Sequence, residues 1–514
     1  MFVRKKKNRS GSTSVVVADK SSGRFKELVT IGVASDPEEI DRLCIQGKEW
    51  IDRHKGQLPL DFLGEDLKVK ELEQARGFIS SIESVLMNGA KMIFDRVYDC
   101  VGFNRIADEE LRQLVIARLC EPMSKRATVD YLRRHFVEDV YLHRIYRYMD
   151  KLYNTQRELV QQISVEHTFK VLGGRVEILF YDVTSLYFES FRSDELRSPG
   201  FSKDGKTAET QIILGLLVCE HGYPLSYSIF NGAQYEGYTM IPIIDDFKQR
   251  FKLNDFVVVA DSGFMTNKNI ELLRKAGYKF IVGARIKKAG TAARKWMLSL
   301  PHRNGECHEM KLDNGDRLVV SYSQTRADKD AYNRRRGVER LRKNFASGKV
   351  TKDKLNKRGY NKFLRIDNDV KVVIDQDKIR EDEKWDGLKG YLTNTDLSRQ
   401  AVIEQYHGLW QVERAFRISK GTLEARPIFH FTEKRIEAHI CICFVAYKVY
   451  KELERLLYLF GLEMSVDTVI KIAKTITTIQ LKLPLNGTTL TQTLLLNPEQ
   501  RLLQPLLETL GLPG

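Results

Sequence analysis

The pattern of hydrophobic and polar positions changes along the chain. Residues 1–37 alternate over short stretches around a polar, basic loop, which predicts a short β-rich N-terminal segment. Residues 38–170 repeat their hydrophobic positions every three to four residues, which is typical of amphipathic helices. Near residue 175 the pattern becomes that of buried strands, beginning with RVEILFYDVTSLYFES. The sequence therefore predicts a mainly helical N-terminal region followed by a domain built on a sheet.

Strands and helices alternate within residues 171–284. Two strands meet at a turn at His221-Gly222, and later buried strands read DFVVVADSG and YKFIVGARI. The stretches TMIPIIDDFKQRF and NKNIELLRKAG, which have helical periodicity, lie between and around them. This succession of elements predicts an α/β layered domain.

Residues 285–398 interrupt that order. The stretch CHEMKLDNGDRLVVSYSQT predicts a hairpin around Asn314-Gly315, and KVVID and KGYLTNT are further strands. The segment 331–358 carries eleven Lys or Arg residues against two acids. We expect a β-rich, basic insertion in which this segment either contacts phosphates or forms a solvated loop.

Residues 399–455 return to helical periodicity and complete the α/β domain, and residues 456–514 form a C-terminal region. The stretch LLQPLLETLGL in that region either packs on its own core or adds a dimer contact. The stretch YHGLWQVERAFRISK, residues 406–420, predicts one helix with an acidic residue, Glu413, in apolar surroundings. Its near neighbours are Leu409, Trp410 and Phe416. A carboxylate among such side chains is costly unless a cation or metal compensates it.

The charge of the chain indicates its class of partner. A formal charge of +15 and a pI near 9.2 favour polyanions, of which nucleic acid is the commonest large one. The sequence has no uncharged apolar stretch of membrane-spanning length, so a membrane partner is not expected. Its seven cysteines are scattered without a CxxC pair, which indicates a reducing compartment and argues against a zinc module.

Two carboxylates stand at predicted strand ends. Asp182 follows VEILFY, and Asp261 follows FVVVA. Acids at the carboxyl ends of sheet strands often face a crevice, and two neighbouring acids repel unless a divalent cation lies between them. Magnesium prefers such oxygen ligands, and a two-metal site cleaves phosphodiesters. For either residue alone, a turn cap at the end of the strand is the alternative.

Together these residues resemble a known family. Two strand acids, in FYDVTSLYFES and VVADSGFMTNKNI, followed by a helical Glu413, are similar to the DDE transposases of bacterial insertion sequences. The helix resembles the Y-x2-R-x3-E-x6-K signature of the insertion-sequence-four superfamily, with Tyr406, Glu413 and Lys420 in place and Leu409 where the arginine stands. The resemblance implies a ribonuclease H-like catalytic core, interrupted by the β-rich insertion.

It also implies an activity and a set of ligands. Such a transposase binds the terminal inverted repeats of its element, cuts the strands and joins the 3′-hydroxyl ends to target DNA. Asp182, Asp261 and Glu413 would hold two Mg²⁺ ions, or Mn²⁺. Double-stranded DNA is the expected partner, and a homodimer is expected in the synaptic complex. The helical region 38–170 would bind DNA at the element end or the partner subunit. The bacterial cytoplasm, at the nucleoid, is the expected location.

The resemblance assigns DNA contacts as well. Tyr406 and Lys420 would contact phosphate, with Arg414 or Arg417 supplying the charge missing at Leu409. A tryptophan of the insertion would stack a flipped base, or else pack in the core. The candidates are Trp296 and Trp385. The insertion's basic residues, among them Arg334, Arg335 and Arg336, would contact phosphate independently of sequence.

Two other functions fit the same residues. A metal-dependent nuclease on this scaffold would cut DNA without joining it, and an inactive DNA-binding regulator would do neither. Neither the repeat sequence nor the target preference follows from the chain. The sequence also leaves open a cut-and-paste or a replicative route, a hairpin intermediate and whether this copy is active.

Overall fold

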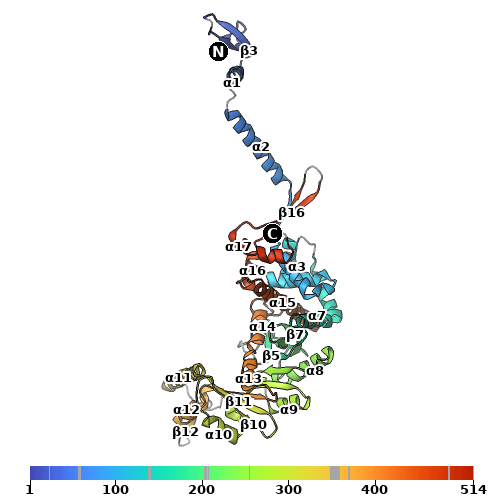
Figure 1. Ribbon diagram of the computed structural model, residues 1–514, viewed down its shortest axis with the longest axis vertical. Coiled ribbons are helices and arrows are strands. Elements are labelled where there is room, and N and C mark those ends of the chain that lie inside the picture. The colour runs from blue at the N-terminus through green and yellow to red at the C-terminus, as the bar shows by residue number, and fades with distance from the viewer. Residues whose placement is uncertain are drawn as a thin grey trace. The chain divides into compact units, whose positions relative to one another are not determined.

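The computed structural model describes the chain except residues 22, 56–59, 137–139, 202–204, 207, 254, 265, 348–358, 368–370, 484–486 and 513–514 (Figure 1). The chain forms two compact units. One comprises Met1–Val85 and Ile479–Gln492, and the other comprises Leu86–Thr478 and Thr493–Gly514. Among the described helices none is long and apolar enough to cross a membrane.

The smaller unit begins with an antiparallel sheet of three strands. Asp36 caps the helix that packs on this sheet by accepting a hydrogen bond from the Glu39 N–H group, as helix starts prefer. A second sheet pairs a strand near the N-terminus with two late strands, in the order β16-β15-β4. The elements are β1 (Phe2–Lys7), β2 (Thr13–Asp19), β3 (Lys26–Ala34), α1 (Pro37–His54), α2 (Leu60–Ser80), β4 (Ile82–Leu86), β15 (Thr477–Lys482) and β16 (Thr489–Leu494).

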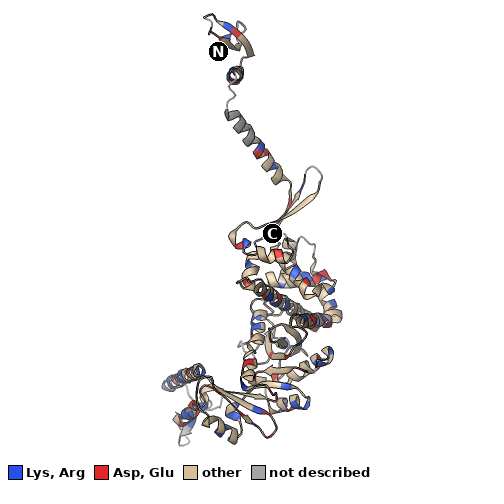
Figure 2. Ribbon diagram, viewed as in Figure 1, with Lys and Arg blue, Asp and Glu red and all other residues tan. Residues whose placement is uncertain are grey.

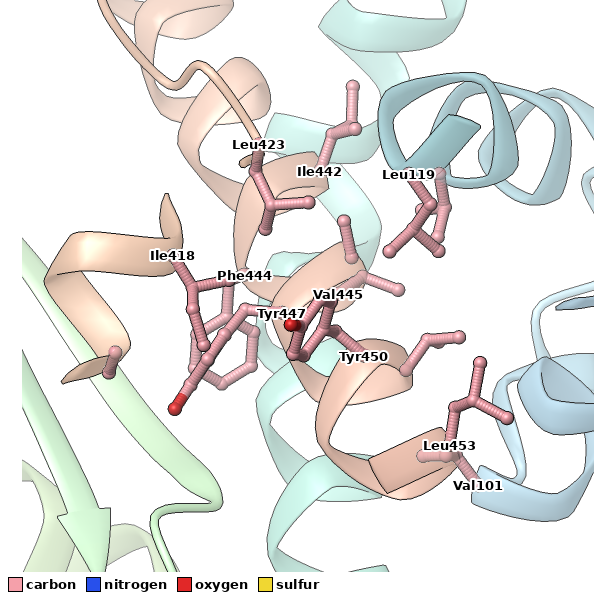
Figure 3. Packing of buried hydrophobic residues seen from close by; sticks show 14 of the residues in the cluster. Val101, Leu119, Ile418, Leu423, Ile442, Phe444, Val445, Tyr447, Tyr450 and Leu453 are labelled. Carbon is pink, nitrogen blue, oxygen red and sulfur yellow. The ribbon is translucent and has the colours of Figure 1, made fainter. Parts of the chain in front are cut away.

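The larger unit contains a helical part built around one long helix, α15 (Glu433–Leu459). Helices from the N-terminal half pack on it, and Figure 3 shows Val101, Leu119 and Ile418 in the cluster around it. Most of its side chains are buried because it is covered on several sides. Its neighbours are α3 (Gly89–Val101), α4 (Glu109–Cys120), α6 (Leu142–Lys151), α7 (Arg157–Val171) and α16 (Val466–Ala473), and α5 (Lys125–Phe136) packs on α4 and α6.

Eight strands of the larger unit form one sheet in the order β10-β11-β14-β9-β8-β5-β6-β7. The pairs β5–β8 and β8–β9 are parallel, and the other neighbours are antiparallel. The predicted mixed α/β class is therefore confirmed, as are the hairpins at His221-Gly222 and Asn314-Gly315. The strands are β5 (Ile178–Tyr187), β6 (Gln211–Cys219), β7 (Pro224–Asn231), β8 (Val257–Ala260), β9 (Lys279–Ala284), β10 (Cys307–Lys311), β11 (Arg317–Tyr322) and β14 (Leu388–Thr393).

Helices cover both faces of this sheet. Leu179 and Tyr181 of β5 belong to a core shared with α8 (Met240–Phe251) and α9 (Asn267–Lys275). Phe180, between them, faces the opposite way, into the core that contains α13 (Arg399–His407), α14 (Trp410–Lys420) and α15. Alternate residues of a strand point to opposite faces of its sheet. We call the face towards which Phe180 points the α13–α14 face.

The insertion differs from the β-rich prediction. It supplies β10, β11 and β14 to the main sheet, so the sheet continues through it, and three further helices accompany these strands in the part that the structure describes. Much of the basic segment lies in a helix, α11 (Figure 2), and residues 348–358 lie outside the described residues. The remaining elements are α10 (Thr291–Ser299), α11 (Gln324–Ala346), α12 (Gln376–Glu383), β12 (Leu364–Asp367) and β13 (Lys371–Ile374).

The C-terminal stretch packs on its own unit. It forms α17 (Pro498–Arg501) and α18 (Gln504–Thr509), and Leu503, Leu506 and Leu507 are buried in the main core. Of the two alternatives left open by the sequence, core packing is therefore the one observed.

Candidate active site

Two acidic residues lie side by side on neighbouring parallel strands. β5 and β8 pair in a register that sets Tyr181 opposite Ala260. Asp182 and Asp261 are the next residues along, so their backbones are separated by about the strand spacing of 4.8 Å. β8 ends at Ala260, as predicted, whereas β5 continues to Tyr187, so Asp182 lies within its strand rather than at its end.

Both aspartates belong to the α13–α14 face of the sheet. Phe180 and Val259, two residues before Asp182 and Asp261, contribute to the core under these helices. The turn between α13 and α14 rests on Phe180, because a Cβ atom added to Gly408 would lie 2.3 Å from Phe180 Cζ. α14 also packs on β5 and β6. The helix therefore starts close to Asp182.

Glu413, in the first turn of α14, is exposed. Leu409 and Phe416 are buried in the core beside it, and Trp410 is 51% exposed. The prediction that this carboxylate is held among aromatic side chains is therefore wrong: it lies at the edge of the buried stripe, in contact with solvent. Within the described part of the chain, Glu413 has no ion-pair partner. Its charge is thus available to a ligand.

The predicted single helix 406–420 is interrupted. α13 ends at His407 and α14 begins at Trp410, with a tight right-handed turn at Gly408 and Leu409 between them. Tyr406 and Glu413 consequently belong to different helices.

We expect Gly408→Ala to destabilise the protein, since its methyl group would clash with buried Phe180 and lie 3.0 Å from the Gln405 carbonyl oxygen. A cost of about 1–3 kcal/mol in the free energy of unfolding is typical of overpacking. Urea denaturation measures it. Gly290→Ala is the matched control, because nothing lies within 4 Å of its added Cβ. Equal stability of the two variants would contradict the proposed close approach of α14 to β5.

Tyr406 binds one of the aspartates directly. Its hydroxyl donates a hydrogen bond to Asp261 Oδ1 at 2.7 Å, and its ring is buried. The hydroxyl reaches this position over Gly283, where a Cβ would lie 2.6 Å from it. Burial and the neighbouring Asp261 raise the pKa of Tyr406, so it stays protonated and donates. In this arrangement the hydroxyl orients Asp261, and the predicted contact with a DNA phosphate would require it to leave that carboxylate.

Lys389 of β14 lies beside the same residues. Its ammonium is 4.4 Å from the centre of the Tyr406 ring. Burial and Arg326 lower the pKa of Lys389, while Asp261 and Glu413 act in the opposite direction. The charges of both candidate acids therefore act on one ammonium group. Sequence reasoning missed Lys389 because a lysine in a short strand of the insertion carries no motif.

A polar cavity of about 530 Å³ connects Asp261 and Tyr406 with the insertion. Most cations in its wall are paired: Lys287 and Lys362 with Asp382, and Arg334 with Asp386. Lys389 also lines it, without a carboxylate within ion-pair distance among the described residues. The insertion thus forms one wall of the candidate site.

The remaining insertion residues divide into buried and exposed ones. Trp385 is 5% exposed and packs in a core cluster, with half-buried Trp296 against it. Arg334 is buried and donates two hydrogen bonds of 2.6 Å to Asp386. Trp385 and Arg334 therefore have structural contacts and also line the cavity that contains Asp261, and their contacts with DNA stay predictions. Arg335 and Arg336 are exposed, and the guanidinium group of each lies 5.6 Å from the centre of the exposed Tyr332 ring.

The cations around α14 also differ from one another. Arg414 pairs with Glu454 of α15, so it does not supply the charge missing at Leu409 in this arrangement. Arg417 is exposed, one turn beyond Glu413, and Lys420 is half-buried two turns beyond it. Contacts of Arg417 and Lys420 with DNA stay predictions.

The donor set suits a hard divalent cation, because it consists of carboxylates on one face of the sheet. The carboxylates do not converge as they lie: Asp182 Oδ1 accepts the Val183 N–H group at 2.8 Å, and Asp261 accepts from Tyr406. Among the described residues, no three His, Cys, Asp or Glu side chains are close enough together to hold a metal ion. The register of β5 and β8 sets the backbones of Asp182 and Asp261 close enough to share an ion, and their side chains would rotate to reach it.

Comparison with known proteins identifies the class. Residues 173–448 match the transposase DDE domain family, and the match covers Asp182, Asp261 and Glu413. The chain belongs to this family of DDE transposases. No curated protein matches the sequence. A solved chain of the piggyBac transposase synaptic complex with hairpin DNA is similar at a TM-score of 0.39 and 9% identity, over 71% of this chain and 70% of that chain.

Proposed function

We propose that this protein is the transposase of a bacterial insertion sequence, of the insertion-sequence-four superfamily with the Y-x2-R-x3-E-x6-K signature. It binds the terminal inverted repeats, cuts the DNA strands and joins the 3′-hydroxyl ends to target DNA. The observation that carries the proposal is the register of β5 and β8, which sets Asp182 beside Asp261 on the face that α14 covers. The antiparallel β5–β6–β7 strands, extended by parallel β8 and β9, support a ribonuclease H-like core.

Asp182, Asp261 and Glu413 are the residues that would hold two Mg²⁺ ions, or Mn²⁺. Bound there, the ions would supply an activated water or hydroxyl and charge stabilisation at the phosphodiester. The protein's own part is to position these acids and the strand. Tyr406 fixes the orientation of Asp261, and Glu413 presents its charge to solvent.

The phosphates of the strand would meet cations on two sides. Lys389 lines the cavity next to Asp261, and Arg417 and Lys420 follow Glu413 along α14. Phosphate contacts of this kind position DNA without reading its sequence. The two element ends would be held together by a homodimer, and the protein would act in the bacterial cytoplasm, at the nucleoid.

Removal of divalent metal is expected to abolish strand cutting and leave DNA binding. The assay uses the full chain and a labelled duplex that carries the element's terminal repeat, with EDTA, Mg²⁺ or Mn²⁺. We expect nicking at the repeat boundary only with metal, because the phosphodiester needs the charge stabilisation that the acids alone lack.

Added target DNA separates recombination from hydrolysis in the same experiment. A transposase joins the labelled 3′ end to the target, which yields a longer labelled product. Cutting without that product would show a nuclease on the same scaffold. Cutting in EDTA would contradict the assignment of the acids as metal ligands.

A further inference from the structure

A second cluster of cations lies away from the candidate active site, in the helical part of the larger unit. A cavity of about 120 Å³ opens between the start of α5, the end of α4 and the segment that precedes α15. Its wall includes Arg118, Lys125, Glu424, His430 and His439. The proposed function assigns no role to these residues.

Two of these cations are buried without the acids that usually accompany them. Lys125 is 4% exposed and Arg118 is 5% exposed. Arg118 Nη2 donates to the Met123 carbonyl oxygen at 3.0 Å, whereas the Lys125 ammonium has no hydrogen-bond or ion-pair partner among the residues that the structure describes. An unpaired buried charge is costly, so such a pair of cations is unusual unless an anion joins them.

The arginines in the cavity wall make the electrostatic potential around Lys125 positive. Burial and Arg118 lower the pKa of Lys125 to about 7. Burial, Lys125 and Arg118 lower the pKa of His430 to about 3, and the same groups lower that of His439. Arg126 and Arg426 also line the cavity, and Glu424, the one carboxylate in its wall, is exposed. Among the groups in this wall, positive charge exceeds negative.

The start of α5 contributes further donors. Ser124 precedes the helix, and its Oγ accepts the Ala127 N–H group at 3.3 Å. The first N–H groups of a helix have no acceptor within it, and with the helix dipole they favour an anion at this end. Ser124, Lys125 and Arg126 all line the cavity, so the start of α5 and the Lys125 side chain border one space.

We propose that this cavity is a binding site for a phosphate group, with Lys125 and Arg118 as its principal ligands. The volume of 120 Å³ equals that of about four water molecules, which suits one phosphate group and is too small for a whole nucleotide. Arginine and lysine are donors that phosphate prefers; here Lys125 is the first residue of α5, and Arg118 lies in the last turn of α4. The phosphate comes either from the DNA backbone or from a free phosphate ion.

A DNA source is geometrically reasonable because the cavity is linked to the catalytic strand. The Ile428 N–H group, beside the cavity residue Pro427, donates to the Tyr187 carbonyl oxygen of β5 at 3.1 Å. Tyr187 lies five residues beyond Asp182 on that strand, which corresponds to about 17 Å.

The test is the melting temperature of the full chain in a phosphate-free buffer, with and without inorganic phosphate at constant ionic strength and without metal. Phosphate at saturation is expected to raise the melting temperature of the wild type by roughly 3 °C. Lys125→Met should reduce this response by about half or more, because it weakens phosphate binding about 10- to 100-fold. Without phosphate, the same variant should melt higher than the wild type, because an unpaired buried charge has gone. Lys170→Met, at an exposed position of α7, is the matched control.

The outcomes distinguish a DNA phosphate from a free phosphate ion, and they also show whether the proposal fails. If a terminal-repeat duplex removes the phosphate response of the wild type, the site holds a DNA phosphate; if the duplex leaves it intact, the site holds a free ion. An equal response of wild type and Lys125→Met, or no response of the wild type, overturns the proposal. None of these readouts requires cleavage, so the proposed function could fail independently.

Discussion

Glu413→Gln is expected to reduce strand cutting on the order of 10³-fold while DNA binding is retained. The substitution keeps the size of the side chain and removes its charge, and metal-assisted stabilisation of a phosphodiester is worth several kcal/mol. Because Glu413 is exposed, the fold should be unaffected. The measurement is the initial rate of Mg²⁺-dependent nicking of a terminal-repeat duplex, beside the dissociation constant for that duplex.

Glu404→Gln is the matched control for this experiment. Glu404 is also exposed, but it lies on α13 and accepts a hydrogen bond from Gln400 at 3.0 Å. It should cut like the wild type. If Glu404→Gln is the inactive variant, the third acid lies on α13 and the assignment of Glu413 is wrong. If wild type and both variants bind the duplex and none cuts, the protein is a DNA-binding regulator.

The second large effect is expected on stability, at Glu452 of α15. This carboxylate is 1% exposed and accepts hydrogen bonds from Tyr223 at 2.8 Å and from Arg455 Nε at 2.9 Å, with His167 Nε2 at 3.5 Å. Glu452→Gln leaves the Arg455 guanidinium, whose side chain is 33% exposed, without its anion, and weakens the acceptor of the Tyr223 hydroxyl. Because solvent reaches Arg455, the loss costs about 1–3 kcal/mol in the free energy of unfolding, which denaturant titration measures. Glu433→Gln, exposed on the same helix, should change it by less than about 0.5 kcal/mol.

The same residue gives this prediction a pH dependence. Burial raises the pKa of Glu452, but the hydrogen bonds from His167, Arg455 and Tyr223 outweigh it and lower the pKa to about 2. The unfolded value is about 4.3. The contribution of Glu452 is therefore complete above about pH 4.3 and is lost as the pH falls towards 2. The difference in stability between wild type and Glu452→Gln should shrink over that interval; a constant difference would show that the carboxylate is protonated in the fold.

The strands and the order of the acids were predictable because they depend on local patterns. The alternation in FYDVTSLYFES and the buried run FVVVA specify two strands whatever surrounds them, and an acid directly after a buried strand is visible in the sequence. The side on which the acids meet follows only from the parallel register of β5 with β8. That register joins segments about eighty residues apart and leaves no local signal.

The environment of Glu413 was not predictable for a related reason. Helical spacing identifies the neighbours of Glu413 but not which of them point into the core. The turn at Gly408 packs on Phe180, more than two hundred residues earlier in the chain, and this contact leaves no local signal. The roles of Trp385 and Arg334 likewise depend on tertiary packing, because an aromatic or basic residue in an insertion is equally compatible with a core and with DNA. That Lys125 is buried without a partner could not be predicted either, because it depends on all the residues that the fold brings around it.

The place of α15 in the fold has a consequence for protein synthesis. Helices α3 to α7 leave the ribosome first, yet the surface that buries them is supplied by residues 433–459. At ordinary elongation rates they wait roughly 15 to 60 s for that partner. A chain that terminates before α15 would therefore expose their apolar faces and should be degraded or aggregate, so early termination would yield no folded fragment of this helical part to compete with the complete protein.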